Sequence, residues 1–387
     1  MDRKCQQPGK KPGMICGKSC VKGAATCLYH SNETDGRSPC PYCGTLILEK
    51  SLKKHVSKCP RFVQEHKVQT DPCFQKDFNS FSIQNVSDDV VVDEDWSSEK
   101  WKNFEKSLFE ISGSQNLVSI NWTDSPIPKN STEKHDLQHK AIWRVLEPFV
   151  PECDCFVELG AGKASLSYHI SQQLKRPAKF VAIDFGSFKG KSDRDFRRDD
   201  VSIKRIRIDI KDIVLSRVPE IAASRKICLY SKHLCGSGTD LALKSIENLL
   251  QAKKDLIIGL VPCCHGKCIW SEFSNQGFFQ QRNISSSDFK RLCQAGSWSC
   301  AVESSKLAIS EDQRIQIGRL ARRAINMARS EFISLKLETT AELVEFISPS
   351  VSPENLVLLA NTSSEIPFQT KKRKRTRPSQ TCNITNV

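Results

Sequence analysis

The sequence predicts an α/β protein, in which a Rossmann-like domain is preceded by two small zinc-binding modules. Two observations predict this fold. From residue 134 onward, short apolar runs alternate with helical stretches, which is typical of βαβ units around a parallel sheet. Eight of the 18 cysteines lie before residue 74, at spacings that suit metal ligands better than disulfides.

The chain of 387 residues is basic, because 58 Lys and Arg against 44 Asp and Glu give a net charge of +14. This excess favours a polyanionic partner, since phosphates attract Lys and Arg through counterion release, but it also fits a basic protein without such a partner. The N-terminal residues lack the apolar segment of a secretory signal, and no apolar run approaches the ~20 residues of a membrane span. We therefore expect an intracellular protein of the nucleus, the cytoplasm or both, with reduced cysteines.

Changes in composition divide the chain into five expected parts. Residues 1–34 and 35–62 are the cysteine-rich modules, 63–130 a linker with one helix, 131–360 the main domain, and 361–387 a basic tail. The tail carries the run KKRKRTR, which suits a nuclear import signal, a phosphate-binding arm or a solubilising end.

The second module contains a compact set of potential zinc ligands, Cys40, Cys43, His55 and Cys59. Zinc takes four such ligands in a tetrahedron, and a two-residue gap between cysteines supplies one pair. The run EKSLKKHVSKC is expected to form a helix that carries the other pair. The alternative is that these cysteines are free structural thiols.

The first module offers a looser set, Cys5, Cys16, Cys27 and His30, with Cys20 as a rival ligand. Segments this small bury almost no apolar surface, so we expect them to need metal in order to fold. Lysines lie between the ligands of both modules and suggest a surface that faces phosphates; the alternative is a solvated basic face.

A glycine-rich turn follows an apolar run in CFVELGAGKASLS. Gly160 and Gly162, with Ala161 between them, permit a tight turn and close approach of a ligand to the backbone. Glu158 stands beside this turn. A carboxylate there would repel the pyrophosphate of a dinucleotide, but it could pair with the cationic amino acid part of S-adenosylmethionine.

Two further acids follow the next two expected strands. Asp184 ends KFVAID and could accept both ribose hydroxyls, while Asp209 in RIRIDIKD could bond the adenine amino group. Acids that end three consecutive parallel strands all face the carboxyl edge, where open α/β sheets bind ligands. The series predicts a methyl-donor site, with a purely structural turn as the alternative.

Three motifs resemble the Trm13 family of tRNA 2'-O-methyltransferases, namely FVELGAGKASLS, SKHLCGSGTDLAL and PCCHGKC. The resemblance implies a class I methyltransferase domain that methylates the ribose 2'-hydroxyl of nucleotide 4 in the acceptor stem of certain tRNAs. It also implies that the two cysteine-rich sets are a CCCH and a CHHC finger, with Cys43 standing where the family usually has His. Ala164 replaces a glycine of the family's cofactor loop; because it is small and starts a helix, we expect binding to survive.

Lys232 and His233 lie at the end of the run KICLYSKHL and are therefore expected at the ligand edge. Methyl transfer to a ribose hydroxyl needs in-line placement and a group that removes or shares the hydroxyl proton. Lys232 could orient the hydroxyl or stabilise the alkoxide, and His233 could act as the base. The alternatives are a phosphate contact for Lys232 and a backbone hydrogen bond for His233.

The stretch LVPCCHGKC ends the next strand beside the same pocket. Its four potential metal ligands are Cys263, Cys264, His265 and Cys268. A zinc site joined by Cys235 and a cysteine nucleophile are two interpretations. We favour a third, because adjacent cysteines at a strand end are expected to point apart: His265 and Lys267 meet substrate, and the cysteines pack as small buried groups.

Two other functions stay open from the sequence. One is a methyltransferase that acts on a protein or a small thiol, against which the basic charge and the zinc sets argue. The other is a zinc-dependent RNA-binding protein with an inactive Rossmann-like domain, for which Ala164 would be the sign. The three acids argue against this second alternative.

Overall fold

The computed structural model describes Cys5, Cys16, Cys20 and residues 37–81, 97–113, 117–119, 128–298 and 309–363. The chain forms two compact units, Met1–Phe74 and Gln75–Val387. Within the described ranges, no helix combines the length and apolarity that crossing a membrane requires. The run KKRKRTR of the tail lies outside these ranges.

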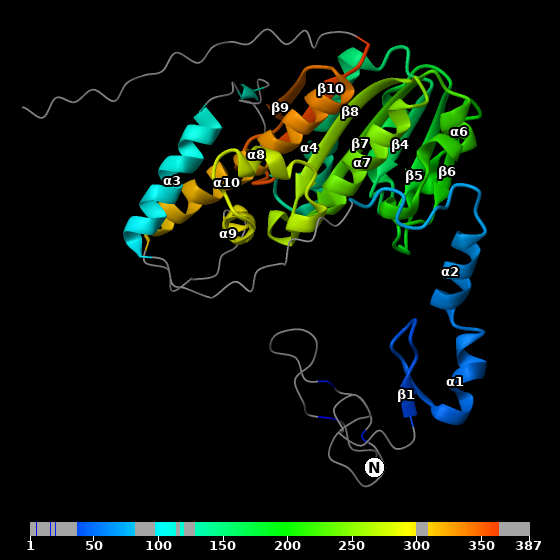
Figure 1. Ribbon diagram of the computed structural model, residues 1–387. Helices are drawn as coiled ribbons and strands as arrows, with labels where there is room; N and C mark the ends of the chain where they lie inside the picture. Colours follow the sequence, from blue (N-terminus) through cyan, green and yellow to red (C-terminus); the bar gives the residue numbers. More distant parts are fainter. Residues whose placement is uncertain are drawn as a thin grey trace, which may run out of the picture. The chain divides into compact units, whose positions relative to one another are not determined.

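The described part of the first unit is a hairpin followed by two helices (Figure 1). β1 (Arg37–Pro39) pairs antiparallel with β2 (Leu46–Leu48), and α1 (Glu49–Val56) and α2 (Pro60–Gln69) follow. The hairpin turn is closed because Cys40 donates its N–H to the carbonyl of Thr45 and accepts from the N–H of Gly44, both at 2.8 Å.

The described part of the first unit has almost no apolar core. α1 buries none of its residues. Among the described residues of the unit, the buried apolar side chains are all cysteines, namely Cys5, Cys40, Cys59 and Cys73. Burial of large apolar side chains is the main driving force of folding, so the hydrophobic burial seen among these described residues cannot account for their fold.

The second unit is built on an eight-stranded sheet in the order β3-β9-β10-β8-β7-β4-β5-β6 among the described residues. Its strands are β3 (Val118–Ser119), β4 (Cys155–Leu159), β5 (Ala178–Ile183), β6 (Val201–Ile206), β7 (Lys226–Cys235), β8 (Asp255–Cys263), β9 (Ala341–Glu345) and β10 (Leu356–Asn361). β10 runs antiparallel to its neighbours β8 and β9, and the other pairs are parallel. The predicted α/β, Rossmann-like fold is confirmed, and each apolar run predicted as a strand forms one.

Helices cover both faces of this sheet (Figure 1). The α-helices in the described part of this unit are α3 (Ser98–Gly113), which packs on α10, then α4 (Ser131–Leu146), α5 (Ser165–Gln173), α6 (Pro219–Ala222), α7 (Gly238–Leu250), α8 (Gln276–Gln280), α9 (Ser286–Gly296) and α10 (Glu311–Leu337). The chain moves from β4 to β5 in one direction along the sheet and from β7 to β8 in the other. Because parallel crossovers are right-handed, α5 and α7 lie on opposite faces.

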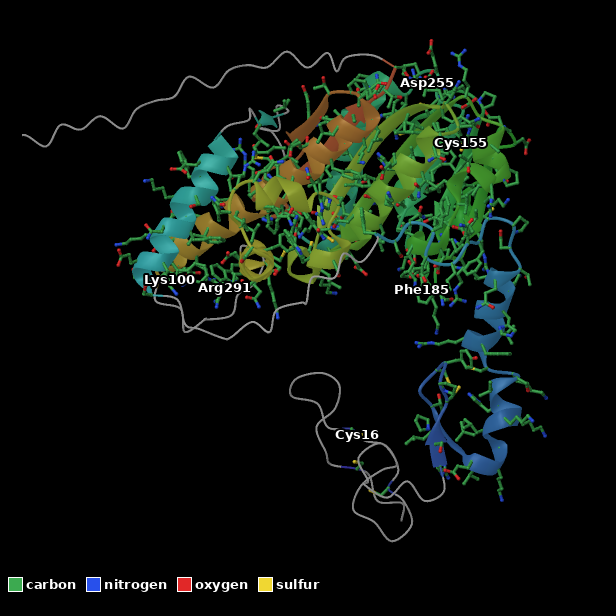
Figure 2. All side chains as sticks on the ribbon, in the orientation of Figure 1. Cys16, Lys100, Cys155, Phe185, Asp255 and Arg291 are labelled. Carbon is green, nitrogen blue, oxygen red and sulfur yellow. The ribbon has the colours of Figure 1, made fainter. Side chains whose placement is uncertain are left out.

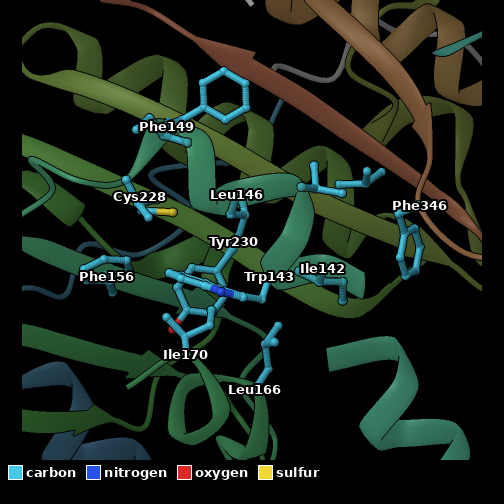
Figure 3. Close-up of a cluster of buried hydrophobic side chains, with 14 of the residues drawn as sticks. Ile142, Trp143, Leu146, Phe149, Phe156, Leu166, Ile170, Cys228, Tyr230 and Phe346 are labelled. Atoms are coloured by element: carbon cyan, nitrogen blue, oxygen red, sulfur yellow. The ribbon is translucent and has the colours of Figure 1, made fainter. Parts of the chain in front are cut away.

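One face packs against α4 and α5. Figure 3 shows Trp143 and Leu146 of α4 gathered with Ile170 of α5 and Tyr230 of β7. α4 approaches the backbone of β8 so closely that a Cβ on Gly259 would lie 2.5 Å from Leu146 Cδ2. The central strands bury both faces, which explains why they form unbroken apolar runs in the sequence instead of alternating with polar residues.

Two parts of residues 63–130, expected as a linker, are packed on the second unit. α3 buries an apolar stripe at helical spacing, Trp101, Phe104, Leu108 and Ile111, and Glu105 accepts hydrogen bonds from two glutamines of α10. Nearer the start of residues 63–130, the side-chain amide of Asn79 donates at 2.7 Å to the carbonyls of Ile210 and Ile213. The polar composition of this stretch hid both contacts, because each depends on partners more than 130 residues away in the chain.

A fully buried ion pair joins α7 to α10. Arg329 Nη2 lies 2.6 Å from Asp240 Oδ2, and neither side chain is exposed. Ser274 also donates to Asp240, so the carboxylate is well satisfied by hydrogen bonds.

Candidate functional site

The carboxyl ends of β4 and β7 meet where the strand order reverses, and open α/β sheets bind ligands at this point. Gly160, which follows β4, packs closely on Leu234 of β7, since a Cβ built on Gly160 would lie 2.9 Å from Leu234 Cδ1. Figure 2 shows Phe185, which follows β5, at the opposite end of the sheet from Cys155 and Asp255, which begin β4 and β8.

The glycine-rich turn has a left-handed backbone at three positions. Gly160 and Gly162 have φ angles of +69° and +51°, which glycine adopts freely. No atom lies within 4 Å of a Cβ built on Gly162, so there is open space beside the turn. Ala161 donates its N–H to the carbonyl of Ile183 at 2.9 Å and ties the turn to β5.

Ala164 is the third left-handed residue, with φ 60° and ψ 31°, and its side chain is fully buried. It precedes α5, in agreement with the prediction that it starts a helix. An alanine in this conformation is strained by roughly 1–2 kcal/mol. The structure thus gives a reason for the glycine that the family resemblance implies here, and it shows a cost that the sequence did not reveal.

Asp184 is hydrogen-bonded directly to the glycine-rich turn. Its carboxylate accepts from the N–H of Gly162 at 2.7 Å and from the N–H of Gly186 at 2.5 Å. On the other side, Arg205 donates to the Gly162 carbonyl at 2.9 Å and forms a bidentate pair with Asp193 at 2.6 and 2.7 Å. This pair raises the pKa of Arg205 and lowers that of Asp193. Neither Arg205 nor Asp193 was predicted from the sequence, because no motif joins them.

Glu158 lies within β4, beneath the turn, and is only 3% exposed. Its carboxylate accepts hydrogen bonds from the N–H and the hydroxyl of Ser167, and that hydroxyl is 2.7 Å from Tyr230 Oη. Burial raises the pKa of Glu158 to about 7, although Ser167, Lys232 and Arg205 act to lower it. A cation placed beside this carboxyl would favour its ionised form.

Asp209 follows the end of β6 by three residues and accepts from the N–H of Lys211 at 3.0 Å, which caps the short helix η3 (Ile210–Asp212). Because β6 adjoins β5, Asp209 lies at the same edge of the sheet as Asp184. The structure therefore brings Glu158, Asp184 and the glycine-rich turn into close association, and it directs the Asp209 carboxylate to η3.

A β-bulge near the end of β7 presents Lys232 and His233. The pairing register with β8 shifts between Lys232 and Leu234, which leaves His233 outside the ladder with a left-handed φ of 64°. Such a φ is uncommon for a non-glycine residue, and bulges often redirect side chains next to active sites. Both side chains are half-buried.

Lys232 contacts a residue of α4 that was not predicted as a site residue. Lys232 Nζ lies 3.1 Å from His135 Nδ1, and the His135 ring lies 6.5 Å from that of His233, measured between centroids. Burial lowers the pKa of Lys232 to about 8. Burial, with the positive charge of Lys232, lowers the pKa of His233 to about 4. Lys232 therefore titrates near neutral pH, whereas His233 is already neutral there.

His265 lies inside the domain, with an exposed fraction of 1%. Its Nε2 is 3.0 Å from Asn326 Nδ2 of α10, and its Nδ1 is 3.7 Å from Glu354 Oε2. Burial, together with nearby arginines, holds the pKa of His265 well below its usual range. This position differs from the predicted substrate-facing wall, because a ring enclosed against α10 has no surface to offer a macromolecule.

The cysteines at the ends of β7 and β8 do not point apart. Cys235 Sγ lies 3.2 Å from Cys263 Sγ, which lies 3.6 Å from Cys264 Sγ. The divergence expected for adjacent cysteines was wrong, because the left-handed backbone of Cys264, with φ 51° and ψ 46°, turns its sulfur back toward Cys263. Cys268 lies apart from this group, with its sulfur 3.2 Å from Arg329 Nη2.

In the first unit, the four predicted ligands converge. One atom from each of Cys40, Cys43, His55 and Cys59 lies within 4.8 Å of every other. Cys40 Sγ is 3.9 Å from Cys59 Sγ, and Cys43 Sγ is 3.3 Å from His55 Nε2. The helix carries only His55, because α1 ends at Val56 and Cys59 precedes α2. Hydrogen bonding with Thr45 lowers the pKa of Cys43 to about 6, which favours the thiolate that a metal needs.

The other predicted zinc set is described only in part. Cys5 is buried, and Cys16 and its rival Cys20 are half-buried. Cys27 and His30 lie outside the described residues, so this set remains a prediction.

The strand order and the site together define a class of protein. The parallel order β6-β5-β4-β7-β8, the antiparallel β10 beside β8, and acids around a glycine-rich turn at the switch point are those of a Rossmann-like class I methyltransferase. The chain belongs to the TRM13 family, since residues 124–361 match the family model described as Methyltransferase TRM13. The resemblance seen in the motifs is thereby confirmed.

Curated relatives cover most of the chain. A protein of Vanderwaltozyma polyspora described as tRNA:m(4)X modification enzyme TRM13 is 25% identical, over 92% of this chain and 97% of its own length. A protein of Schizosaccharomyces pombe with the same description is 26% identical, over 83% of this chain and 94% of its own length. Among solved structures, the plantazolicin methyltransferase BpumL covers 68% of this chain and 98% of its own length at 12% identity, but its TM-score of 0.31 is too low for a comparison of folds.

Proposed function

We propose that this methyltransferase acts on tRNA, and that it transfers a methyl group from S-adenosylmethionine to the ribose 2'-hydroxyl of nucleotide 4 in the acceptor stem of certain tRNAs. Membership of the TRM13 family and relatives described as tRNA:m(4)X modification enzymes support the substrate. The observation that carries the mechanism is Lys232, a half-buried amine with a pKa of about 8 at the switch point of the sheet.

The donor site consists of the glycine-rich turn and the three acids. When bound, S-adenosylmethionine supplies an activated methyl group on a cationic sulfur. Glu158 would meet the donor's ammonium group, which favours its ionised form despite burial. The open space beside Gly162 leaves room for the donor against the backbone of Gly160, Ala161 and Gly162. Asp184 would accept the ribose hydroxyls, and Asp209 would accept from the adenine amino group with the carboxylate oxygen that does not cap η3.

Lys232 is proposed to take the proton of the ribose hydroxyl. A general base works best when its pKa lies near the working pH, and burial brings Lys232 into that range. At neutral pH the pKa of about 4 makes His233 a weaker proton acceptor than the sequence analysis expected. We therefore assign His233 an orienting part, as a neutral ring at the bulge, and His135 the part of holding Lys232 Nζ.

The first unit is proposed to bind two zinc ions and to contact tRNA. The fit of Cys40, Cys43, His55 and Cys59 to one ion is supported by their mutual distances. Cys5, Cys16, Cys27 and His30 are proposed for the second ion by spacing and resemblance. The lysines exposed on and after α1 could contact phosphates; they are Lys50, Lys53, Lys54 and Lys58.

The test is a methylation assay with the full-length protein, total tRNA and S-adenosylmethionine labelled on the methyl group. We expect label in tRNA, and digestion followed by mapping should place a 2'-O-methyl group at nucleotide 4. Lys232→Ala should lower the rate by about 10²–10⁴-fold, the usual contribution of a general base.

Lys226→Ala is the matched control, because Lys226 begins the same strand at its opposite end and pairs with the exposed Glu152. It should leave the rate unchanged. Label in protein with none in tRNA would contradict the proposed substrate. A 2'-O-methyl group at another nucleotide would retain the reaction and refute the position.

A further inference from the structure

Three thiols from two separate segments meet at the carboxyl edge of the sheet. Cys235 ends β7, Cys263 ends β8, 28 residues later, and Cys264 directly follows β8. Their sulfur atoms all lie within 4.8 Å of one another, and two of the separations are 3.2 and 3.6 Å. Strand pairing accounts for the proximity of Cys235 and Cys263, which face each other in the register, but not for the third sulfur.

The backbone around the three thiols is shaped to bring them together. The left-handed conformation of Cys264 is what turns its sulfur inward. Gly236, also left-handed, donates its N–H to the Cys263 carbonyl at 2.9 Å. A Cβ on Gly236 would lie 2.7 Å from the Lys267 carbonyl oxygen, so only glycine lets the two segments approach this closely.

The separations suit a single metal ion better than a disulfide. Sulfurs bound tetrahedrally to zinc at ~2.3 Å lie about 3.8 Å apart, close to the separations found here. A disulfide joins two sulfurs at ~2.05 Å and would leave the third thiol without a role. Soft thiolate ligands favour zinc over hard cations such as magnesium or calcium.

We propose that Cys235, Cys263 and Cys264 bind a zinc ion, separate from the zinc of the first unit. Cys235 is exposed, so the fourth position of the ion faces solvent and is free for water or another exchangeable ligand. Lys267 donates its backbone N–H to the Cys264 carbonyl at 2.9 Å, and the charge of its side chain would offset part of that of three thiolates on one zinc ion.

The ion would also have a positioning effect on the proposed transfer site. Cys235 lies two residues beyond the bulged His233 and three beyond Lys232, so a bond from its sulfur to the end of β8 would fix the end of the bulge. The proposed binding itself is independent of the methyl acceptor, because it depends only on the three sulfurs.

The experiment is a measurement of zinc per chain in full-length protein purified under reducing conditions without chelators, by mass spectrometry of the metal. Cys235→Ala and Cys264→Ala should each lose one equivalent of zinc relative to the wild type. Cys228→Ala is the matched control, because Cys228 is a buried thiol of the same strand β7 outside the cluster. It should lose none. Differences between variants cancel the zinc held by the first unit.

A second measurement addresses folding and coordination together. Cys235 is exposed, so Cys235→Ala should keep the wild-type melting temperature to within a few degrees. Zinc is then replaced by Co²⁺ in the wild type and in Cys235→Ala, and the absorption spectrum of the variant is subtracted from that of the wild type. The difference should contain a sulfur-to-cobalt charge-transfer band. The proposal is overturned if zinc content and cobalt spectrum are the same in both proteins. The proposal is equally overturned if wild-type protein purified under reducing conditions contains a Cys235–Cys263 disulfide in place of the ion.

Discussion

The two units of this protein are stabilised in different ways. In the first, the buried apolar side chains among the described residues are cysteines, and the ordered part surrounds four potential ligands. In the second, aromatic and aliphatic side chains between an eight-stranded sheet and the helices α4 and α5 form a large core, and the cysteine cluster lies at the carboxyl edge of the sheet. In the described part of the first unit, a cluster of potential metal ligands therefore takes the place of an apolar core. In the second unit, such a cluster is present in addition to a core.

The comparison distinguishes two roles that a bound metal ion can have. It can stabilise the fold itself, or it can position side chains in a domain that folds without it. Where a segment has no core, metal binding supplies the free energy of folding. Where a core already exists, an ion can orient neighbouring side chains without determining whether the domain folds.

The largest effect is expected for Cys59→Ala. It removes one of the four proposed ligands, and structural zinc sites contribute an apparent ~10–16 kcal/mol to the folding of small modules. Hydrogen exchange should show loss of protection over residues 37–69 and unchanged protection in β4 and β7. Retained protection across α1 and α2 would mean that packing, and not metal, orders the first unit.

Next in size is the pH dependence that depends on Lys232. Its pKa of about 8 means that the free amine increases as pH rises through 8, so the rate should rise over this interval and then level off. Loss of this base by Lys232→Ala should cost about 3–5 kcal/mol of transition-state stabilisation. A rate that falls as pH rises above 8 would instead indicate a charged lysine that stabilises the alkoxide.

Glu158→Gln should stabilise the second unit while it weakens binding of the donor. The pKa of Glu158 rises from 4.5 to about 7 on folding, which corresponds to on the order of 3 kcal/mol. Because the folded pKa is the higher one, the native state loses stability as pH rises from about 4.5 to 7. Urea unfolding should therefore show the full gain of the variant at pH 8 and little gain near pH 4.5. An equal gain at both values would refute ionisation as the cause.

The smallest effect is expected for Ala164→Gly. Relief of the left-handed alanine should stabilise by roughly 1–2 kcal/mol, offset in part by about 0.8 kcal/mol for the buried methyl group. We expect a net gain of less than about 1 kcal/mol and a melting temperature higher by a few degrees at most. A clear loss would mean that packing of this methyl group against Ala161 and Ala182 outweighs the strain.

Much of this architecture could be predicted from the chain alone. The apolar runs formed strands because each is buried on both faces, and local composition records that burial directly. Short-range spacing also predicted the group of Cys40, Cys43, His55 and Cys59. The contacts of α3 and Asn79 were missed, since a polar stretch shows no sign of the distant surface on which it docks.

The candidate site likewise combines features that the sequence predicts with features that it does not. The positions of Glu158, Asp184 and Lys232 at one edge follow from strand order, which sequence patterns predict. Their pKa values do not follow from sequence, because they depend on burial and on neighbours such as Ser167 and His135 from other elements. His265 illustrates the limit, since its motif indicated a pocket and packing against α10 enclosed it.

The strands of the sheet, the glycine-rich turn, the acids beside it and the Cys and His spacings typical of zinc sites could be predicted from the sequence alone, because they depend on residues close together in the chain. Only the tertiary structure decided which groups meet. A bulge at His233, a left-handed Cys264 and a right-handed crossover between β7 and β8 bring Lys232 to His135 and three sulfurs to one point. Such encounters depend on backbone angles and packing across many residues, which no local pattern records.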